Sequence, residues 1–451
     1  MRFYLNFIYR CSKINILNMR IIKTISIIGL VLWANTFFAQ GYTKWVLGDT
    51  SDMVTTNHLP GIVLAGGGTD NDNAMVWMLN RAAGGDVVII RASGSNGYNS
   101  YFFSELGVSV NSVETIRFDA ASAANDPYVI RKIRNAEVLF IAGGDQYDYY
   151  QYWRNTPIED AINYLLNEKK GTVGGTSAGM AILGDAYYAP PSSSLTSVQA
   201  LANPYHPNIN VLGKGDFLKA PFLQDLVTDT HYDQRERQGR QVTFLARLAN
   251  DYNKRSYGIA CNEFTAVCID GDGIAKVFGS LAYFLRSNCQ NESKPETILS
   301  ATPLTWNRQQ AAIQVYKMPG AASPTHTFNL NDWETASGGT WENWYVQQGV
   351  LQKQLNVTGI CAPVSASGDL ALPTEAISIV PNPANHVFQL KTDLIGTFDL
   401  QLLDSTGRLI WSANSVAPNT NCQLPKDVPT GVFNLQIHSE SGLLVRKLII
   451  Q

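Results

Sequence analysis

Short apolar segments alternate with amphipathic segments between Pro60 and about Ile269. The apolar runs have the length of strands, and the amphipathic runs repeat apolar residues at helical spacing. The predicted strands are 61–65, 86–91, 113–118, 137–142 and 172–173, and the predicted helices are 72–83, 126–135 and 157–169. This alternation predicts an α/β fold, in which a parallel sheet carries helices on both faces.

Glycines follow three of these strands, at 66–68, 143–144 and 174–175. The carboxyl ends of parallel strands lie at one edge of a sheet, and ligands bind at that edge in folds of this type. We therefore expect a single cleft where the glycine turns meet.

The pattern changes near the end of the first domain, which we assign to residues 41–290. Residues 291–356 are polar and rich in Trp and Gly, and we interpret them as an extension of that domain built from irregular strands. Residues 357–375 have the small and polar composition of a linker. From 376 to 451, about seven short strands separated by turns predict a small all-β sandwich.

The first 40 residues have the layout of a secretory signal peptide. Basic residues without any acid precede the apolar run 25–33, and small and polar residues follow it. Met19 opens a compact basic leader by itself and is an alternative start. The apolar run is short for a membrane anchor, which needs about 20 residues. Export would permit disulfides among the five cysteines that remain, but their pairing is not predicted.

Composition narrows the function classes. The chain of 451 residues has 34 Lys+Arg against 37 Asp+Glu, a formal charge of −3. Charged residues make up only 16%, so nucleic-acid binding is not expected. The histidines and cysteines show no metal-ligand spacing, and neither a metal nor a cofactor is predicted. A homodimer is compatible with this composition.

The segment Gly175–Gly179 fits the pattern G-x-S-x-G between a short strand and an apolar helix. A sharp turn of this kind exposes the serine side chain, here Ser177, at the edge of the sheet. The N–H groups at the start of the helix, beginning with Ala178, can stabilise an oxyanion. Ser177 is therefore a candidate nucleophile.

A second polar cluster runs from Asp229 to Arg240. Among the histidines, His231 has the most polar and charged neighbours in the sequence, which makes it the candidate base for a serine. If residues 234–250 form a helix, Arg237 and Arg240 share one face, while Phe244, Leu245 and Leu248 face the core. Arginines bind carboxylates in a bidentate manner, so a cleft lined by three of them suits an acidic substrate.

Three separated motifs together resemble the cyanophycinase family of serine peptidases, relatives of dipeptidase E. The motifs are Gly143–Gln146, Gly174–Gly179 and the cluster from Asp229 to Arg240, and residues 257–266 also resemble a strand of that family. The similarity spans roughly 60–280 and implies a class I glutamine amidotransferase-like fold. Cyanophycinases cleave a poly-aspartate backbone bearing arginine side groups and release β-aspartyl-arginine.

The resemblance assigns roles to residues of this chain. It implies that Ser177 is the nucleophile and His231 the general base. Gly144 and Ala178 would supply the oxyanion N–H groups. The substrate pocket would be lined by Gln146, Asp229, Arg235, Arg237 and Arg240. The expected substrate is a peptide or isopeptide with acidic groups.

The chain departs from the family at two positions. Thr230 stands where cyanophycinases usually have Gln, which weakens the inference about the substrate. The acid that orients the histidine is also unassigned, because the stretch 192–195, where relatives carry it, holds no carboxylate. Glu263 is the preferred candidate, and Asp185 and Asp216 are the alternatives.

The C-terminal sandwich resembles the sorting domain of the type IX secretion system. The matching features are Pro381–Pro383, Asp404–Arg408, Pro429–Phe433 and the basic and apolar end 446–451. The resemblance implies an export address that contacts the type IX secretion machinery, and so a secreted or cell-surface protein. Two alternatives to an exported hydrolase are a non-catalytic protein that binds ligands in the Arg-lined cleft, and an adhesin that uses the Trp-rich segment 333–344.

Overall fold

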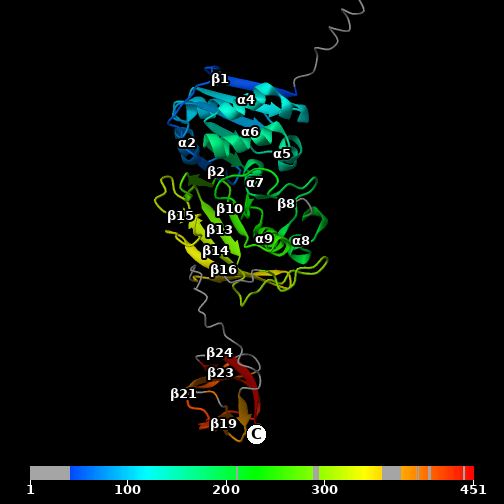
Figure 1. Ribbon diagram of the computed structural model, residues 1–451, viewed down its shortest axis with the longest axis vertical. Helices are drawn as coiled ribbons and strands as arrows, with labels where there is room; N and C mark the ends of the chain where they lie inside the picture. Colours follow the sequence, from blue (N-terminus) through cyan, green and yellow to red (C-terminus); the bar gives the residue numbers. More distant parts are fainter. Residues whose placement is uncertain are drawn as a thin grey trace, which may run out of the picture. The chain divides into compact units, whose positions relative to one another are not determined.

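The computed structural model describes residues 41–209, 212–287, 294–357, 377–392, 394, 396–404, 408–439 and 442–451. The predicted signal peptide lies outside these residues, as does nearly all of the predicted linker. The chain divides into two compact units, Met1–Ile360 and Cys361–Gln451 (Figure 1). In the described part of the chain, no helix is both long and apolar enough to cross a membrane.

The first unit contains a nine-stranded mixed sheet. Its order is β1 (Tyr42–Gly48), β4 (Ser112–Phe118), β3 (Asp86–Arg91), β5 (Val138–Ile141), β6 (Thr172–Thr176), β2 (Gly61–Ala65), β11 (Ala266–Asp270), β12 (Ile274–Phe278) and β15 (Phe328–Asn329). The five strands from β4 to β2 are parallel, which confirms the predicted sheet. Both edges are antiparallel, because β1 pairs with β4 and the hairpin β11–β12 pairs with β2.

Helices cover both faces of this sheet, as predicted. On one face, Met75 and Met78 of α2 (Asp72–Asn80) pack with Val63 and Val87 of the sheet. On the other face, α4 (Pro127–Asn135), α5 (Gln146–Trp153) and α6 (Pro157–Tyr164) bury their apolar sides against the alternate residues of the same strands. Because successive side chains of a strand point to opposite faces, nearly continuous apolar runs such as 61–65 are buried on both sides.

A second, eight-stranded sheet was not anticipated. Its order is β17 (Val350–Leu355), β16 (Thr340–Gln347), β14 (Ile313–Pro319), β13 (Leu281–Ser287), β10 (Tyr257–Cys261), β9 (Leu226–Asp229), β7 (Ala186–Tyr188) and β8 (Leu212–Lys214). The Trp-rich segment supplies β16. Trp333 and Trp344 are buried and Trp341 is half-buried, so these rings belong mainly to the core and do not form an open adhesive surface.

The helix after the histidine cluster packs against this second sheet. It is α9 (Gln238–Tyr252), and Phe244, Leu245 and Leu248 are buried in the core, as predicted. The predicted start at residue 234 is wrong. Glu236 has a φ of 49°, a left-handed conformation that a right-handed helix cannot contain, so the helix begins only after Arg237.

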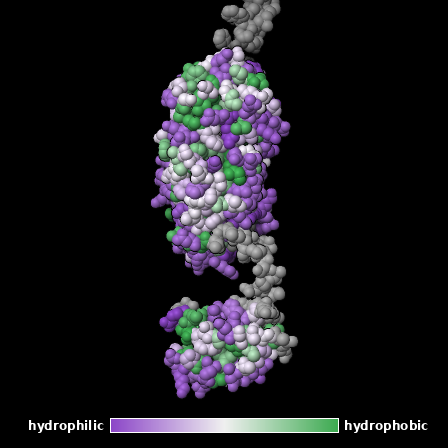
Figure 2. Space-filling view, turned by 90° about the vertical axis from the view of Figure 1, so that its left-hand side faces the viewer, coloured by the Kyte–Doolittle hydropathy of each residue, from purple (hydrophilic) through white to green (hydrophobic). Residues whose placement is uncertain are grey.

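The C-terminal unit is the predicted β-sandwich. One sheet has the order β18 (Ser378–Val380), β19 (Val387–Lys391), β22 (Asn421–Gln423), and the other has the order β21 (Leu409–Val416), β20 (Phe398–Leu403), β23 (Gly431–Ser439), β24 (Gly442–Ile450). The core between them takes alternate residues, such as Phe388 and Leu390 from one sheet and Leu400 and Leu402 from the other. On the face shown in Figure 2, hydrophobic residues of the two units form separate patches among hydrophilic ones.

Candidate active site

Ser177 occupies a strained turn between β6 and α7 (Ala178–Ala181). Its φ is 50° and its ψ is −111°, a combination that a non-glycine residue adopts only when the surrounding structure enforces it. A Cβ atom on Gly175 would lie 2.4 Å from the carbonyl carbon of Gly179, and one on Gly179 would lie 2.1 Å from the carbonyl oxygen of Ile141. Glycine is therefore required on both sides of the serine for the strand and helix to approach each other.

A hydrogen-bonded chain links Ser177 to a histidine and a glutamate. Ser177 Oγ lies 2.8 Å from His231 Nε2, and His231 Nδ1 lies 2.6 Å from Glu263 Oε1. His231 follows β9, and Glu263 lies in the turn between β10 and β11. A carboxylate can only accept a hydrogen bond, so the imidazole proton belongs on Nδ1, and Nε2 remains free to accept the serine proton.

The two sheets meet at these residues. β6 ends at Thr176, just before Ser177, and the Ser177 N–H donates to the carbonyl of Ala65 at the end of β2, at 3.0 Å. β9 and β10 of the second sheet lead into the histidine and glutamate loops. Figure 1 shows β2, α7 and β10 at this junction. Backbone hydrogen bonds join the loops across the junction: His231 N–H donates to Gly66 O at 2.8 Å, and Phe264 N–H donates to Gly67 O at 3.1 Å. The site thus lies at the carboxyl edge that the glycine turns predict.

The two alternative acids have other partners. Asp185 Oδ2 forms an ion pair with Lys214 Nζ at 2.9 Å. Asp216 pairs with Arg154 at 2.5 Å and accepts a hydrogen bond from the Tyr187 hydroxyl at 2.9 Å. Of the three candidates, the structure brings only Glu263 to His231.

Burial sets the proton affinity of His231. Burial lowers its pKa below the ordinary value, the hydrogen bond that His231 donates to Glu263 opposes this effect, and the charges of Arg235 and Arg237 lower the pKa further. The net direction is downward, so the imidazole is neutral at neutral pH and can accept a proton.

This direction predicts the acid limb of the pH–rate profile. Protonated His231 cannot accept the serine proton, so the rate rises with pH as the histidine loses its proton. Because its pKa is lowered, the midpoint should fall below about 6.5, the ordinary value for histidine. The profile of kcat/KM against pH measures it, with the melting temperature followed in parallel because the same protonation favours the unfolded chain. A midpoint above the ordinary value contradicts the prediction.

The two residues expected to supply oxyanion N–H groups come from different loops. Gly144 follows β5, Ala178 opens α7, and both line the same pocket as Ser177. Neither N–H donates a hydrogen bond to another of the residues that the structure describes. Both groups are thus available to an oxygen that develops negative charge above the serine.

The pocket beside Ser177 has a volume of about 70 Å³. It brings together all five predicted substrate-binding residues, Gln146, Asp229, Arg235, Arg237 and Arg240. Thr230, the position that departs from the family, also lines it, as does Phe244, which the sequence places in the core. Sequence reasoning missed Tyr188 and Thr228. The missed aromatic and threonine side chains have no distinguishing motif, so only the fold identifies them.

The three arginines of this pocket are not equivalent. Arg240 is buried and forms two hydrogen bonds with Asp229, from Nε to Oδ2 at 2.8 Å and from Nη2 to Oδ1 at 2.5 Å. Arg237 Nη1 donates to the carbonyl and hydroxyl oxygens of Thr230, both at 2.9 Å. The Arg235 side chain is exposed and has no hydrogen bond or ion pair within the described ranges. Arg235 is therefore the cation best able to meet a ligand carboxylate.

Gly67, which the sequence analysis did not single out, packs directly against the reacting groups. A Cβ atom there would lie 2.5 Å from both Cε1 and Nε2 of His231 and 3.0 Å from Cβ of Ser177. The signal that could have identified it is its place in the glycine turn after β2.

We predict that Gly67→Ala lowers kcat by about 10²-fold, because the imidazole must move by a large fraction of an ångström to admit the methyl group. Gly84→Ala is the matched control: Gly84 has a similarly positive φ of 82°, but a Cβ atom there meets nothing within 4 Å. Comparing the two variants separates contact with His231 from backbone strain. Equal losses of activity in both variants would contradict the steric explanation.

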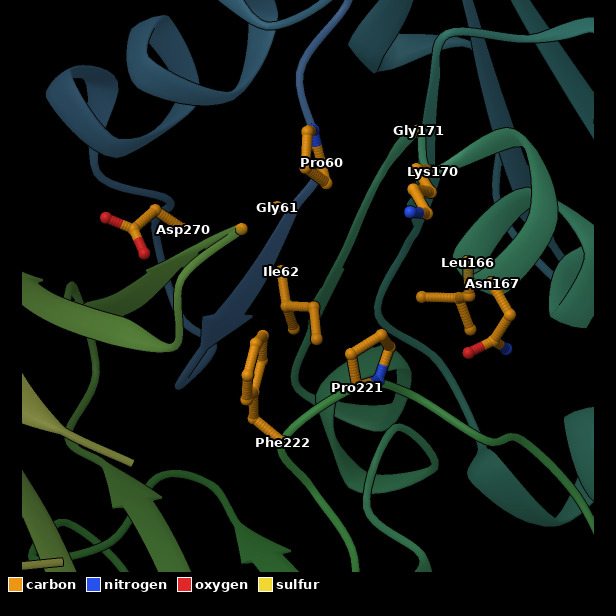
Figure 3. A pocket seen from close by; sticks show the side chains of 11 residues that line it. Pro60, Gly61, Ile62, Leu166, Asn167, Lys170, Gly171, Pro221, Phe222 and Asp270 are labelled. Carbon is orange, nitrogen blue, oxygen red and sulfur yellow. The ribbon is translucent and has the colours of Figure 1, made fainter. Parts of the chain in front are cut away.

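A larger hollow, of about 250 Å³, lies at the opposite ends of β2 and β6 (Figure 3). Its walls include Pro60, Ile62, Pro221 and Phe222, with Lys170 at its rim. Its lining contains neither Ser177 nor a histidine. The pocket beside Ser177 is therefore the candidate active site, although it is the smaller of the two.

A strained nucleophile turn, a histidine and a carboxylate in hydrogen-bonded sequence define the class of serine hydrolases with a triad. Comparison with known families narrows this class. Residues 96–277 match the model of peptidase family S51, and residues 378–451 match that of the secretion system C-terminal sorting domain. The chain contains a peptidase S51 domain followed by a sorting domain, which marks it for secretion or for the cell surface.

The chain is also similar to several cyanophycinases. It is 24% identical over 230 residues to that of Synechococcus elongatus, covering 49% of this chain and 66% of the relative. With that of Geminocystis herdmanii it shares 27% identity over 177 residues, covering 39% and 58%. The chain thus spans less than two thirds of these relatives. Among solved structures, a peptidase from an acI-B1 Actinobacterium matches with a TM-score of 0.37 and 16% identity, over 50% of this chain and 91% of that one.

Proposed function

We propose that this protein is an exported serine peptidase that hydrolyses peptide or isopeptide bonds near aspartate through an acyl-enzyme. The observation that carries the proposal is the chain of short contacts, 2.8 Å from Ser177 Oγ to His231 Nε2 and 2.6 Å from His231 Nδ1 to Glu263. These distances allow proton transfer between neighbouring groups without a rearrangement.

The mechanism follows from the roles of these atoms. Ser177 Oγ attacks the carbonyl carbon of the scissile bond while its proton passes to His231 Nε2. The oxygen of the tetrahedral intermediate accepts hydrogen bonds from the N–H groups of Gly144 and Ala178. His231 then donates the proton to the leaving amine, and the acyl group remains on Ser177. A water molecule, deprotonated by His231, releases the acid product and restores the serine.

The charges of the pocket support an acidic substrate. Three arginines and one aspartate line it, an excess of two positive charges. Since Asp229 and Thr230 hold Arg240 and Arg237, Arg235 is the group that meets a substrate carboxylate. The relatives named cyanophycinase make cyanophycin the first substrate to test, and other aspartyl peptides the second.

Incubating the full chain with cyanophycin and following β-aspartyl-arginine by mass spectrometry tests this function. Release by the parent but not by Ser177→Ala supports both the nucleophile and the substrate. If neither releases product, a library of aspartyl peptides follows, and labelling by a fluorophosphonate probe reports whether Ser177 is reactive. A serine that is neither labelled nor active on any of them overturns the proposal in favour of a ligand-binding protein.

A non-catalytic binding protein is the second hypothesis from the sequence. Its main support was the absence of a carboxylate in the stretch 192–195. The contact between His231 and Glu263 removes that support, because a carboxylate from a different loop occupies the orienting position.

We expect Arg235→Ala to raise KM for an acidic peptide about fivefold and to leave kcat nearly unchanged, because an exposed ion pair contributes about 1 kcal/mol. Arg235→Lys, which retains the charge, should recover part of the loss. The same peptide with its carboxylate replaced by an amide is the control and should not distinguish parent from variant. A fall in kcat with unchanged KM would contradict the prediction, because it would show that Arg235 does not act by binding the substrate carboxylate.

A further inference from the structure

Two hydrogen bonds join the loop of His231 to the loop of Glu263. Asp233 N–H donates to Asn262 Oδ1 at 3.0 Å, and Asn262 Nδ2 donates to Asp233 Oδ2 at 2.8 Å. Asp233 lies two residues after His231, and Asn262 immediately precedes Glu263. The pair is reciprocal, so each residue is both donor and acceptor, and the separation of the two loops is fixed at this point.

Further contacts hold Asp233 in place. Its carboxylate accepts hydrogen bonds from Gln238 Nε2 at 2.6 Å, at the start of α9, and from the Tyr283 hydroxyl at 2.8 Å, on β13. Asn262 is buried. Next to the pair, Glu263 N–H donates to Gln234 Oε1 at 3.1 Å. The histidine loop is thus connected to the glutamate loop and to the second sheet by side chains that do not line the Ser177 pocket.

The backbone at both loops requires such support. His231 has a φ of 46° and Phe264, just after Glu263, has a φ of 57°. Non-glycine residues keep left-handed conformations only when the surrounding contacts over-determine them. Without those contacts, the loops would relax toward ordinary backbone conformations, and the imidazole and carboxylate would move apart.

We propose that Asp233 and Asn262 are positioning residues that hold the His231 loop against the Glu263 loop and thereby set the geometry of the serine, histidine and glutamate. Neither residue contacts the serine or lines the pocket, so they act through His231 and Glu263. The inference rests on the proposed function, since it concerns the activation of Ser177. A displacement of about 1 Å in such a chain can cost about 10²-fold in rate.

The reciprocal pair permits a test by exchange of the two side chains. Asn262→Asp places a second carboxylate opposite Asp233, which removes one hydrogen bond and adds repulsion. The double variant Asp233→Asn with Asn262→Asp restores complementarity, because the new amide at 233 donates to the new carboxylate at 262. That carboxylate still accepts the backbone N–H of residue 233, and the remaining oxygen at 233 still accepts from Gln238 and Tyr283.

The measurement is the rate at which a fluorophosphonate probe labels Ser177 in the full chain. This probe requires an activated serine but no identified substrate. We expect Asn262→Asp to label at least about tenfold more slowly than the parent, and the exchange variant to return to within about threefold. Asn135→Asp is the matched control: Asn135 Nδ2 donates to Asp52 at 2.9 Å outside the site, so the same chemical change there should leave the rate unchanged.

The outcomes separate the two proposals. If the parent labels and Asn262→Asp keeps the parental rate, or the exchange variant stays as slow as the single one, the positioning role is overturned while the proposed function stands. If the parent is neither labelled nor active on cyanophycin or the aspartyl peptides, both are overturned. If the parent hydrolyses a peptide but is not labelled, the hydrolysis rates of the same variants replace the labelling rates in the comparison. Should Asn262→Asp fail to fold, Asp233→Asn alone replaces it, because this change removes one hydrogen bond without burying a charge. The test is then whether the exchange variant labels faster than Asp233→Asn and returns to near the parental rate.

Discussion

Ser177→Ala is expected to reduce hydrolysis of the susceptible peptide by about 10⁶-fold, to the level that binding and the oxyanion N–H groups alone provide. Only the Oγ atom is lost. Alanine accepts the φ of 50° no less readily than serine, so the strained turn is expected to keep its conformation. Single-turnover rates with a large excess of enzyme measure a loss of this size, and fluorophosphonate labelling should vanish in parallel.

The control must show that the loss is chemical. Ser104→Ala removes an exposed hydroxyl that donates to the Ser100 carbonyl at 3.0 Å, and it should match the parent in rate and labelling. The Ser177→Ala protein should still bind an acidic peptide with about parental affinity, because the arginine pocket is intact. Retention of substantial hydrolysis by Ser177→Ala would mean that the reaction does not proceed through this serine.

Local patterns explain which parts of the fold could be predicted. The five central strands are short apolar runs buried on both faces, and the helices between them are local in sequence. The second sheet depends on long-range antiparallel pairing, such as β13 with β14 and β14 with β16, between partly polar segments. The turns and the periodicity of these segments carry little information about which strand pairs with which. For this reason the sequence predicts only irregular strands in the Trp-rich segment.

The candidate site likewise contains local features, which the sequence predicts, and long-range contacts, which it does not. The turn around Ser177 is a local motif, and Gly175 is required by its contact with Gly179, four residues further on. Glu263 lies 32 residues from His231 along the chain, and its contact depends on how two loops of different strands meet. The sequence places Asp229 and Arg240 in the same pocket but does not predict that they pair with each other, because this contact forms only in the folded chain.

Glu263→Gln is expected to lower kcat by about 10³-fold. The amide can present its NH₂ group to Nδ1, which favours the imidazole tautomer that carries its proton on Nε2 and cannot accept from Ser177. The loss should be smaller than the roughly 10⁴-fold typical of a buried aspartate, because the Glu263 side chain is 39% exposed and solvent can partly replace it. KM should change little, since Glu263 does not line the pocket.

A second readout distinguishes loss of the orienting acid from general damage. Glu263 raises the pKa of His231, whereas burial and the charges of Arg235 and Arg237 lower it, so removing the carboxylate should move the acid limb of the pH–rate profile to still lower pH. Asp185→Asn and Asp216→Asn are the matched controls, because each removes a carboxylate paired elsewhere, with Lys214 and Arg154 respectively. Both should retain the parental acid limb and kcat within a few-fold. A large loss of kcat in either control, with Glu263→Gln near parental, would transfer the role of the orienting acid to that aspartate and require the histidine loop to move during catalysis.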